Sequence, residues 1–152
     1  MDNINKAIYF DMDGTIADFY GVDNWLDMLM NSDTTPYKVA KPLVNMNVLA
    51  RYLNRLQDKG YIIGIVSWLS KKGNNKYNKE VTETKKKWLA KHLKSVKWNE
   101  VHIIKYGTPK HEVVNNTNGI LFDDEEQNRT NWKGIAHDEK NIINVLKTID
   151  KQ

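Results

Sequence analysis

Short apolar runs alternate with segments of helical periodicity along this chain. The runs are rich in Ile, Val, Leu, Phe and Tyr, which is typical of strands buried on both faces. They cover residues 8–10, 61–67, 101–104 and 119–122, and residues 134–136 are a candidate fifth strand. Strands that alternate with helices predict an α/β fold. We expect a doubly wound, Rossmann-like parallel sheet of about five strands with helices on both faces.

Apolar residues spaced three and four positions apart predict the helices between these strands. The predicted helices cover residues 22–30, 46–59, 80–94 and 109–116, and a terminal helix follows Asp138. Gly60 occupies the position after the second helix, where a left-handed residue often ends a helix. The polar segments 31–36 and 71–78 are predicted to be irregular.

Length and composition predict one soluble domain that spans residues 1–152. The chain is 40% hydrophobic and 28% charged, which is ordinary for a globular protein. No apolar run approaches the roughly 18 residues of a membrane span, and no secretory signal is visible. The chain has no cysteine, which excludes disulfides and thiol catalysis and fits a reducing compartment. The cytoplasm is therefore the expected location, without a membrane partner.

The chain carries a positive surplus that favours anionic partners. Its formal net charge is +4 and its pI is about 9.1. Ten lysines crowd between Lys71 and Lys97. Such a run is usually a solvated helix face, and nucleic-acid binding through it stays open as an alternative.

Two pairs of acidic residues follow apolar runs and define the candidate site. Asp11 and Asp13, with Gly14 next, end the first run, and Asp123 and Asp124 end the fourth. The carboxyl ends of parallel strands meet at one edge of a sheet, where such folds bind ligands. Carboxylates held that close repel unless a cation or a shared proton compensates, and a hard ion such as Mg²⁺ prefers oxygen ligands. We therefore expect one shared metal site.

Two further positions, Lys110 and Ser67, bear on this site. Thr108 and Pro109 predict a helix start, which places Lys110 in the first turn. A cation there opposes the helix dipole, so Lys110 makes sense only beside phosphate or carboxylates, and Lys105 is its rival. Ser67 ends the second apolar run, where a hydroxyl is usually a simple strand terminator.

The run Asp-Met-Asp-Gly-Thr at residues 11–15 resembles the opening motif of the haloacid dehalogenase superfamily, whose common members are magnesium-dependent phosphatases. Ser67, Lys110 and the Asp123–Asp124 pair follow in the order of that superfamily's other motifs. The stretch 11–19 also resembles its 5'(3')-deoxyribonucleotidase branch.

The resemblance implies a role for each of these residues. Asp11 would be the nucleophile that forms an aspartyl-phosphate, Asp13 the general acid and base, and Lys110 the cation that stabilises the phosphoryl group. Mg²⁺ would be held by Asp11, the Asp13 backbone carbonyl and the acidic pair, in which Asp124 is preferred to Asp123. The phosphoryl group would be bound by the remaining motif positions, Gly14, Thr15, Ser67 and Trp68.

Residues 16–44 are the expected cap, and they suffice for one short helix and a loop. The deoxyribonucleotidases carry a larger helical cap there, so this site should be fairly open. A small phosphorylated substrate, above all a nucleotide, is expected because Phe19, Tyr20 and Trp25 could stack on a base. A nucleic-acid 3'-end or protein phosphatase and a non-catalytic binding module are the alternatives, although the latter would be expected to lack Asp11 or Asp13. The oligomeric state stays open.

Overall fold

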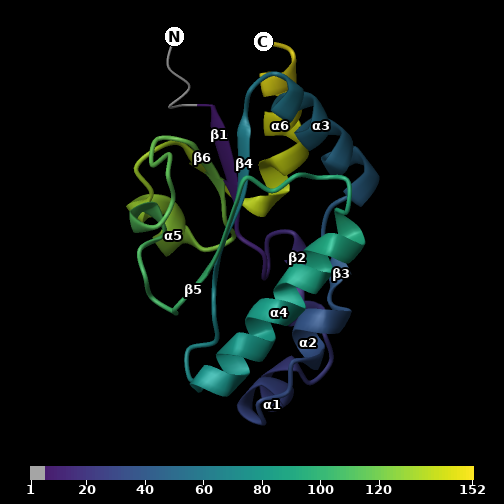
Figure 1. Ribbon diagram of the computed structural model, residues 1–152, viewed down its shortest axis with the longest axis vertical. Coiled ribbons are helices and arrows are strands. Elements are labelled where there is room, and N and C mark those ends of the chain that lie inside the picture. The colour runs from purple at the N-terminus through teal and green to yellow at the C-terminus, as the bar shows by residue number, and fades with distance from the viewer. Residues whose placement is uncertain (1–5) are drawn as a thin grey trace.

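A parallel sheet of five strands forms the centre of the computed structural model, which describes residues 6–152. The strands are β1 (Ala7–Phe10), β4 (Ile62–Trp68), β5 (Glu100–Ile104), β6 (Ile120–Phe122) and β7 (Ala136–His137). Their order is β5-β4-β1-β6-β7, so β1 lies in the middle with a parallel neighbour on each side (Figure 1). This order confirms the predicted α/β fold. The prediction that the amino-terminal stretch is no secretory signal involves residues 1–5, which lie outside the described residues.

Three helices cover one face of the sheet. They are α3 (Met46–Asp58), α4 (Asn75–His92) and α6 (Ile142–Asp150). Their apolar stripes pack against Ile8, Phe10, Ile63 and Ile65 of the central strands to form the main core. The side chain of Asn45 caps α3, and Gly60 follows its end at φ +93°, as predicted.

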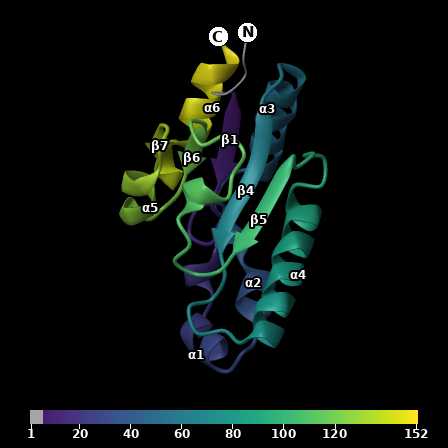
Figure 2. The ribbon, with the colours of Figure 1, turned by 60° about the vertical axis from the view of Figure 1, so that its left-hand side comes forward.

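The opposite face is covered more thinly, by α5 (Glu126–Asn131) and by the segment 105–118 (Figure 2). The predicted helix over 109–116 is wrong, because only Lys110–Glu112 forms a turn of 3₁₀ helix and Thr108 makes no capping hydrogen bond. Tertiary partners take up the backbone of this segment instead. The N–H of Asn115 donates to the Glu100 carboxylate at 3.1 Å, and the N–H of Asn116 donates to the Tyr9 hydroxyl at 3.2 Å.

Residues 16–44 form a compact flap at the carboxyl end of the sheet. An antiparallel pair, β2 (Ala17–Asp18) and β3 (Lys41–Pro42), closes its base. Two short helices lie between them, α1 (Trp25–Met30) and α2 (Thr35–Val39), so the expectation of one helix and a loop is wrong. The helix predicted from residue 22 begins only at Trp25. The predicted loop 31–36 contains the start of α2, where the Asp33 carboxylate accepts hydrogen bonds from Thr35.

Helix α4 is longer than predicted and carries the flap on its amino-terminal half. It begins at Asn75 inside the segment predicted to be irregular, because the Asn74 side chain accepts a hydrogen bond from the N–H of Tyr77. Tyr77 and Val81 pack against Phe19 and Tyr37 of the flap. Figures 1 and 2 both place α1 and α2 beside this half of α4, beyond the sheet.

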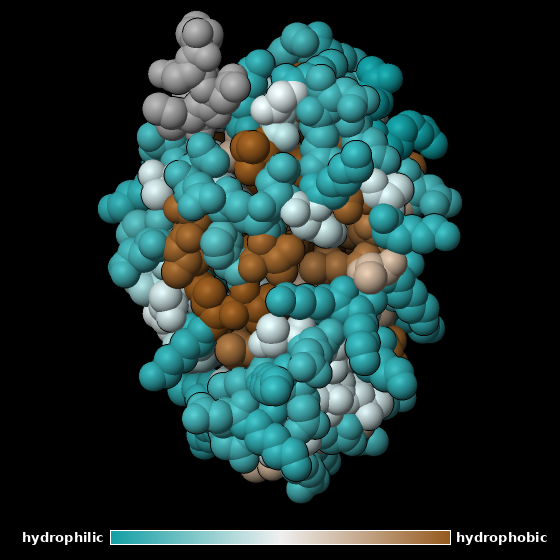
Figure 3. All heavy atoms as spheres, in the orientation of Figure 1, coloured by the Kyte–Doolittle hydropathy of each residue, from teal (hydrophilic) through white to brown (hydrophobic). Residues whose placement is uncertain are grey.

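The surface of α4 is strongly basic. Nine of the ten lysines between Lys71 and Lys97 are exposed, and Lys85 alone is buried. Figure 3 shows hydrophilic residues over the lower part of this face, where α4 lies, and hydrophobic residues gathered in the middle, over β4 and β5. None of the helices within residues 6–152 combines the length and the apolar character that a membrane span requires.

Candidate active site

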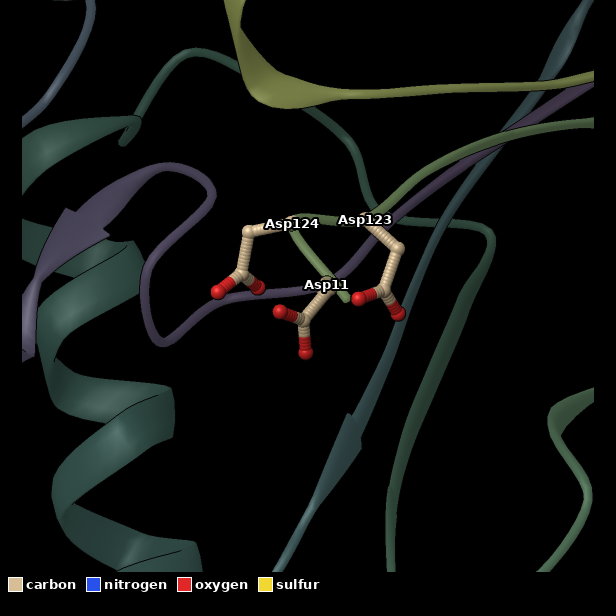
Figure 4. A group of neighbouring side chains, drawn as sticks. All are labelled: Asp11, Asp123 and Asp124. Atoms are coloured by element: carbon tan, nitrogen blue, oxygen red, sulfur yellow. The ribbon is translucent and has the colours of Figure 1, made fainter. Parts of the chain in front are cut away.

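The ends of β1 and β6 bring three carboxylates together. The register pairs Phe10 with Phe122, and the N–H of Asp11 donates to the Phe122 carbonyl at 2.9 Å. Asp11 therefore lies between Asp123 and Asp124, as Figure 4 shows. One oxygen of each acid lies within 4.8 Å of the others, which is close enough for one cation to touch all three.

The Asp11 carboxylate is almost buried and is held through both oxygens. Lys110 Nζ donates to Oδ1 at 3.0 Å, and the Thr15 hydroxyl donates to Oδ2 at 2.9 Å. Burial raises the pKa of Asp11, but the charge of Lys110, hydrogen bonds with Asp124 and Lys110, and the charge of Lys85 together keep this pKa below its usual range. Burial alone would lower the pKa of Lys110, but Asp11 and Asp123 raise it instead. Lys110 is therefore a fixed cation beside the central acid, whereas Lys105, its rival in sequence, is exposed.

A tight loop after β1 shapes the floor of the site. The Met12 carbonyl accepts hydrogen bonds from the N–H groups of Thr15, Ile16 and Ala17. Gly14 has φ +82°, and a Cβ there would clash with Asp124 Oδ2. Only glycine combines this left-handed backbone with so close an approach to an acid.

Asp123 and Asp124 differ in how the protein satisfies them. Asp123 is fully buried: Oδ1 accepts from the N–H of Glu125, and Oδ2 accepts from Lys110 at 2.6 Å and Asn128 at 3.2 Å. Asp124 has no lysine partner among the described residues, and Thr15 is its hydrogen-bonding neighbour. Asp124 is thus the acid with more lone pairs left for a cation.

The pKa values reflect the crowding of these acids. Burial, followed by the charge of Asp11, raises the pKa of Asp124 to about 8. The same two causes raise the pKa of Asp123 to about 7 against the opposing effect of Lys110. When all of these carboxylates are ionised, their negative charge therefore exceeds the positive charge of the lysines beside them.

Asp13 and Ser67 share a partner that the sequence did not reveal. Lys85 Nζ, from the middle of α4, contacts Asp13 Oδ2 at 3.1 Å and donates to Ser67 Oγ at 2.8 Å. Burial raises the pKa of Asp13, and Lys85 opposes that rise. The expectation that the lysine run is a solvated face is wrong for Lys85. The helical spacing could have revealed it. Lys85 follows Val81 by four residues and precedes Trp88 by three, so it lies on the apolar stripe of α4.

A cavity of about 180 Å³ opens over Asp11, Asp13 and Lys110. Six aromatic side chains contribute to its lining: Phe19, Tyr20, Trp25, Tyr37, Trp68 and Tyr106. The Trp68 ring lies 5.5 Å from Lys110 Nζ and 4.9 Å from the Tyr106 ring, centroid to centroid. The cavity thus joins an acidic, metal-compatible floor to an aromatic wall.

The residues present fit a divalent cation. Four carboxylates and two ammonium groups leave an excess of two negative charges when all are ionised, which one divalent ion would balance. The donors are all oxygens, as Mg²⁺ prefers. Asp11 and Asp124 are the side chains best placed to hold it.

Comparisons with known proteins do not identify a family. No protein-family model matches the chain, and no curated protein matches it. The geometry and charge of the site therefore carry the functional assignment.

Proposed function

We propose that this chain is a Mg²⁺-dependent phosphomonoester hydrolase that forms an aspartyl-phosphate on Asp11. The observation that carries the proposal is the acid cluster itself. Asp11 is held between Lys110 and Thr15 at the floor of a cavity, with Asp13 two residues further and an excess of negative charge that suits one divalent cation. The order of the four motifs, which resembles that of haloacid dehalogenase phosphatases, supports the same chemistry.

The residues of this chain would divide the reaction into two steps. A carboxylate oxygen of Asp11 attacks phosphorus as the bond to the ester oxygen breaks, and Asp13 gives its proton to the departing alcohol. Asp13 then takes a proton from the water that attacks the aspartyl-phosphate, which releases inorganic phosphate. A bound Mg²⁺ would neutralise charge on the phosphoryl oxygens.

Lys110 and Ser67 would stabilise the phosphoryl group during both steps. Lys110 donates two of its three N–H groups to Asp11 and Asp123, so a third is left for a phosphoryl oxygen. The Ser67 oxygen accepts a hydrogen bond from Lys85, which leaves its own O–H to donate. Such fixed donors lower the free energy of the charged transition state.

A nucleotide is the substrate that the cavity favours. The cavity has a volume of about 180 Å³, below the roughly 300–1,000 Å³ of typical ligand sites. It would therefore enclose only the phosphate and the adjoining atoms of the substrate. The rest of the substrate would lie at the rim, where Tyr20 and Tyr106 are 48% and 43% exposed. Stacking of a base on such rings is worth roughly 1–3 kcal/mol.

A phosphorylated nucleic-acid end is the second candidate substrate. Lys71 lines the cavity, and its Nζ lies 5.8 Å from the centre of the Tyr106 ring. Exposed Lys72 follows it, and the exposed lysines of α4, from Lys76 on, could follow a phosphate backbone.

The test is hydrolysis of p-nitrophenyl phosphate with Mg²⁺ and with excess chelator. We expect activity only with the metal, and none in Asp11→Asn, because an amide is a poor nucleophile. Asp58→Asn removes an exposed carboxylate of α3 and is the matched control, which should retain full activity. Equal rates with and without chelator, or an active Asp11→Asn protein, would refute the mechanism. Phosphate binding without turnover in the wild type would favour a non-catalytic binding module.

A further inference from the structure

Lys85 is a buried lysine, and each N–H of its ammonium group has an acceptor within the protein. Its side chain is 1% exposed. The three N–H groups of Nζ have three acceptors, Ser67 Oγ at 2.8 Å, the Trp68 carbonyl at 2.7 Å and Asp13 Oδ2 at 3.1 Å. The ammonium is therefore fixed in one orientation, and it has no donor left for a substrate.

Stability alone does not account for a lysine at this position. Burying an ammonium costs several kcal/mol, and replacing a buried ion pair by apolar side chains is often neutral or stabilising. Position 85 lies on the apolar stripe of α4, where Leu or Met would pack without that cost. The partners of Lys85 instead belong to two motifs of the candidate site, the loop after β1 and the end of β4.

The contacts of Lys85 fix the two motifs relative to each other. Asp13 Oδ2 is bound by the ammonium, and within residues 6–152 Oδ1 is the oxygen without a lysine partner. The Ser67 oxygen and the Trp68 carbonyl are held from the same nitrogen. The Tyr37 ring of the flap lies 5.3 Å from that nitrogen, so the flap also packs against this point.

We infer that Lys85 is a positioning residue that holds Asp13 and Ser67 in the arrangement needed for proton transfer to the leaving group. The inference rests on the proposed phosphatase function and assigns a role to a residue outside the four motifs. Lys85 acts through Asp13 and does not touch the substrate. Its loss should therefore matter most when the leaving group needs a proton.

The test compares two esters in Lys85→Met. The kcat/KM value reports the steps up to release of the alcohol, so it isolates the step in which Asp13 donates its proton. Nitrophenolate leaves with little help, whereas an alkoxide needs protonation. For the alkyl phosphomonoester that the wild type hydrolyses fastest, we expect kcat/KM to fall about 100-fold, the scale of general acid catalysis, and less than tenfold for p-nitrophenyl phosphate.

Two comparisons complete the experiment. Lys86→Met changes the exposed neighbour on the same helix and should leave both substrates unaffected. In an Asp13→Asn background, Lys85→Met should lower kcat/KM little further, because both changes remove the same proton transfer by Asp13. If Lys85→Met does not fold, Lys85→Arg, which retains the charge but not the geometry, allows the same comparison.

Each contrary result has a separate meaning. Equal losses for the two esters, or additive losses in the double variant, overturn the role of Lys85 and leave the phosphatase proposal intact. A wild-type protein that hydrolyses neither ester overturns both proposals.

Discussion

Asp124→Asn should make the metal-free protein more stable while it removes the response to Mg²⁺. Asp124 is the acid of the site without a lysine partner among residues 6–152, and its nearest oxygen lies within 4.8 Å of those of Asp11 and Asp123. Two unit charges at that distance repel by about 3.5 kcal/mol at an effective dielectric constant of 20. Partial exposure and screening reduce this, so we expect a gain of about 2 kcal/mol, or roughly 4–8 °C in Tm.

The gain should depend on pH in a defined direction. The pKa of Asp124 is raised from 3.8 to about 8 by burial and by Asp11. An acid with a raised native pKa contributes stability below its unfolded pKa and loses it as pH rises through the native value. The wild type should therefore lose stability between about pH 4 and 8, whereas the Asn variant lacks this contribution. The difference between them should grow across this interval and level off above it.

Thermal unfolding with and without Mg²⁺ measures both effects. In the wild type, a ligand at a hundredfold excess over its dissociation constant stabilises by about 2.7 kcal/mol, and most of that shift should vanish in Asp124→Asn. Asp58→Asn, which changes an exposed carboxylate of α3, is the control for removal of a negative charge. An Asp124→Asn protein no more stable than wild type at pH 8 without metal would refute the idea that the acids repel each other.

Three further results are expected. Lys110→Ala should lower kcat at least about tenfold, whereas Lys105→Ala should change it little; the reverse ranking would reassign the cation of the site. Glu100→Gln should lower the free energy of unfolding in urea by about 1–2 kcal/mol at pH 7. It should also weaken the loss of stability at acid pH. Burial raises the pKa of Glu100, but hydrogen bonds from Tyr9, His102 and Asn115 lower it overall. The stability that ionised Glu100 contributes is therefore lost as pH falls below about 4.5. An equal loss of stability at acid pH in Glu100→Gln and wild type would contradict this. A deoxynucleoside monophosphate should show a shallow salt dependence of kcat/KM; faster cleavage of a 3'-phosphorylated oligonucleotide that collapses with salt would instead favour the nucleic-acid substrate.

The strands and the acid pairs could be predicted from the sequence because each rests on local pattern. Parallel strands buried on both faces are continuous apolar runs, and the residues that follow them share one edge of the sheet. Asp11, Asp123 and Asp124 meet for that reason alone. Lys110 lies beside Asp11 and Asp123, but the α-helix from which its place was argued does not form.

What the sequence did not reveal depends on distant partners. The segment after Thr108 has helix-start residues, but Glu100 of β5 and Tyr9 of β1 accept its N–H groups. Lys85 looked like one exposed lysine among ten, and its burial follows from the acid and the serine that face it across the sheet edge. At the start of α2, Thr35 donates hydrogen bonds to the Asp33 carboxylate, within a stretch whose composition is that of a loop.

The irregular segment 105–118 joins the cation of the site to a part of the fold with little regular secondary structure. It carries Lys110, yet its backbone has little regular hydrogen bonding of its own and depends on side chains of β1 and β5. Such regions open locally at a lower free energy than the core. Heating should therefore withdraw the site cation before the sheet melts, so that inactivation precedes the loss of secondary structure. Amide hydrogen exchange would register the same event as fast exchange at Asn115 and Asn116 beside slow exchange in β1 and β4.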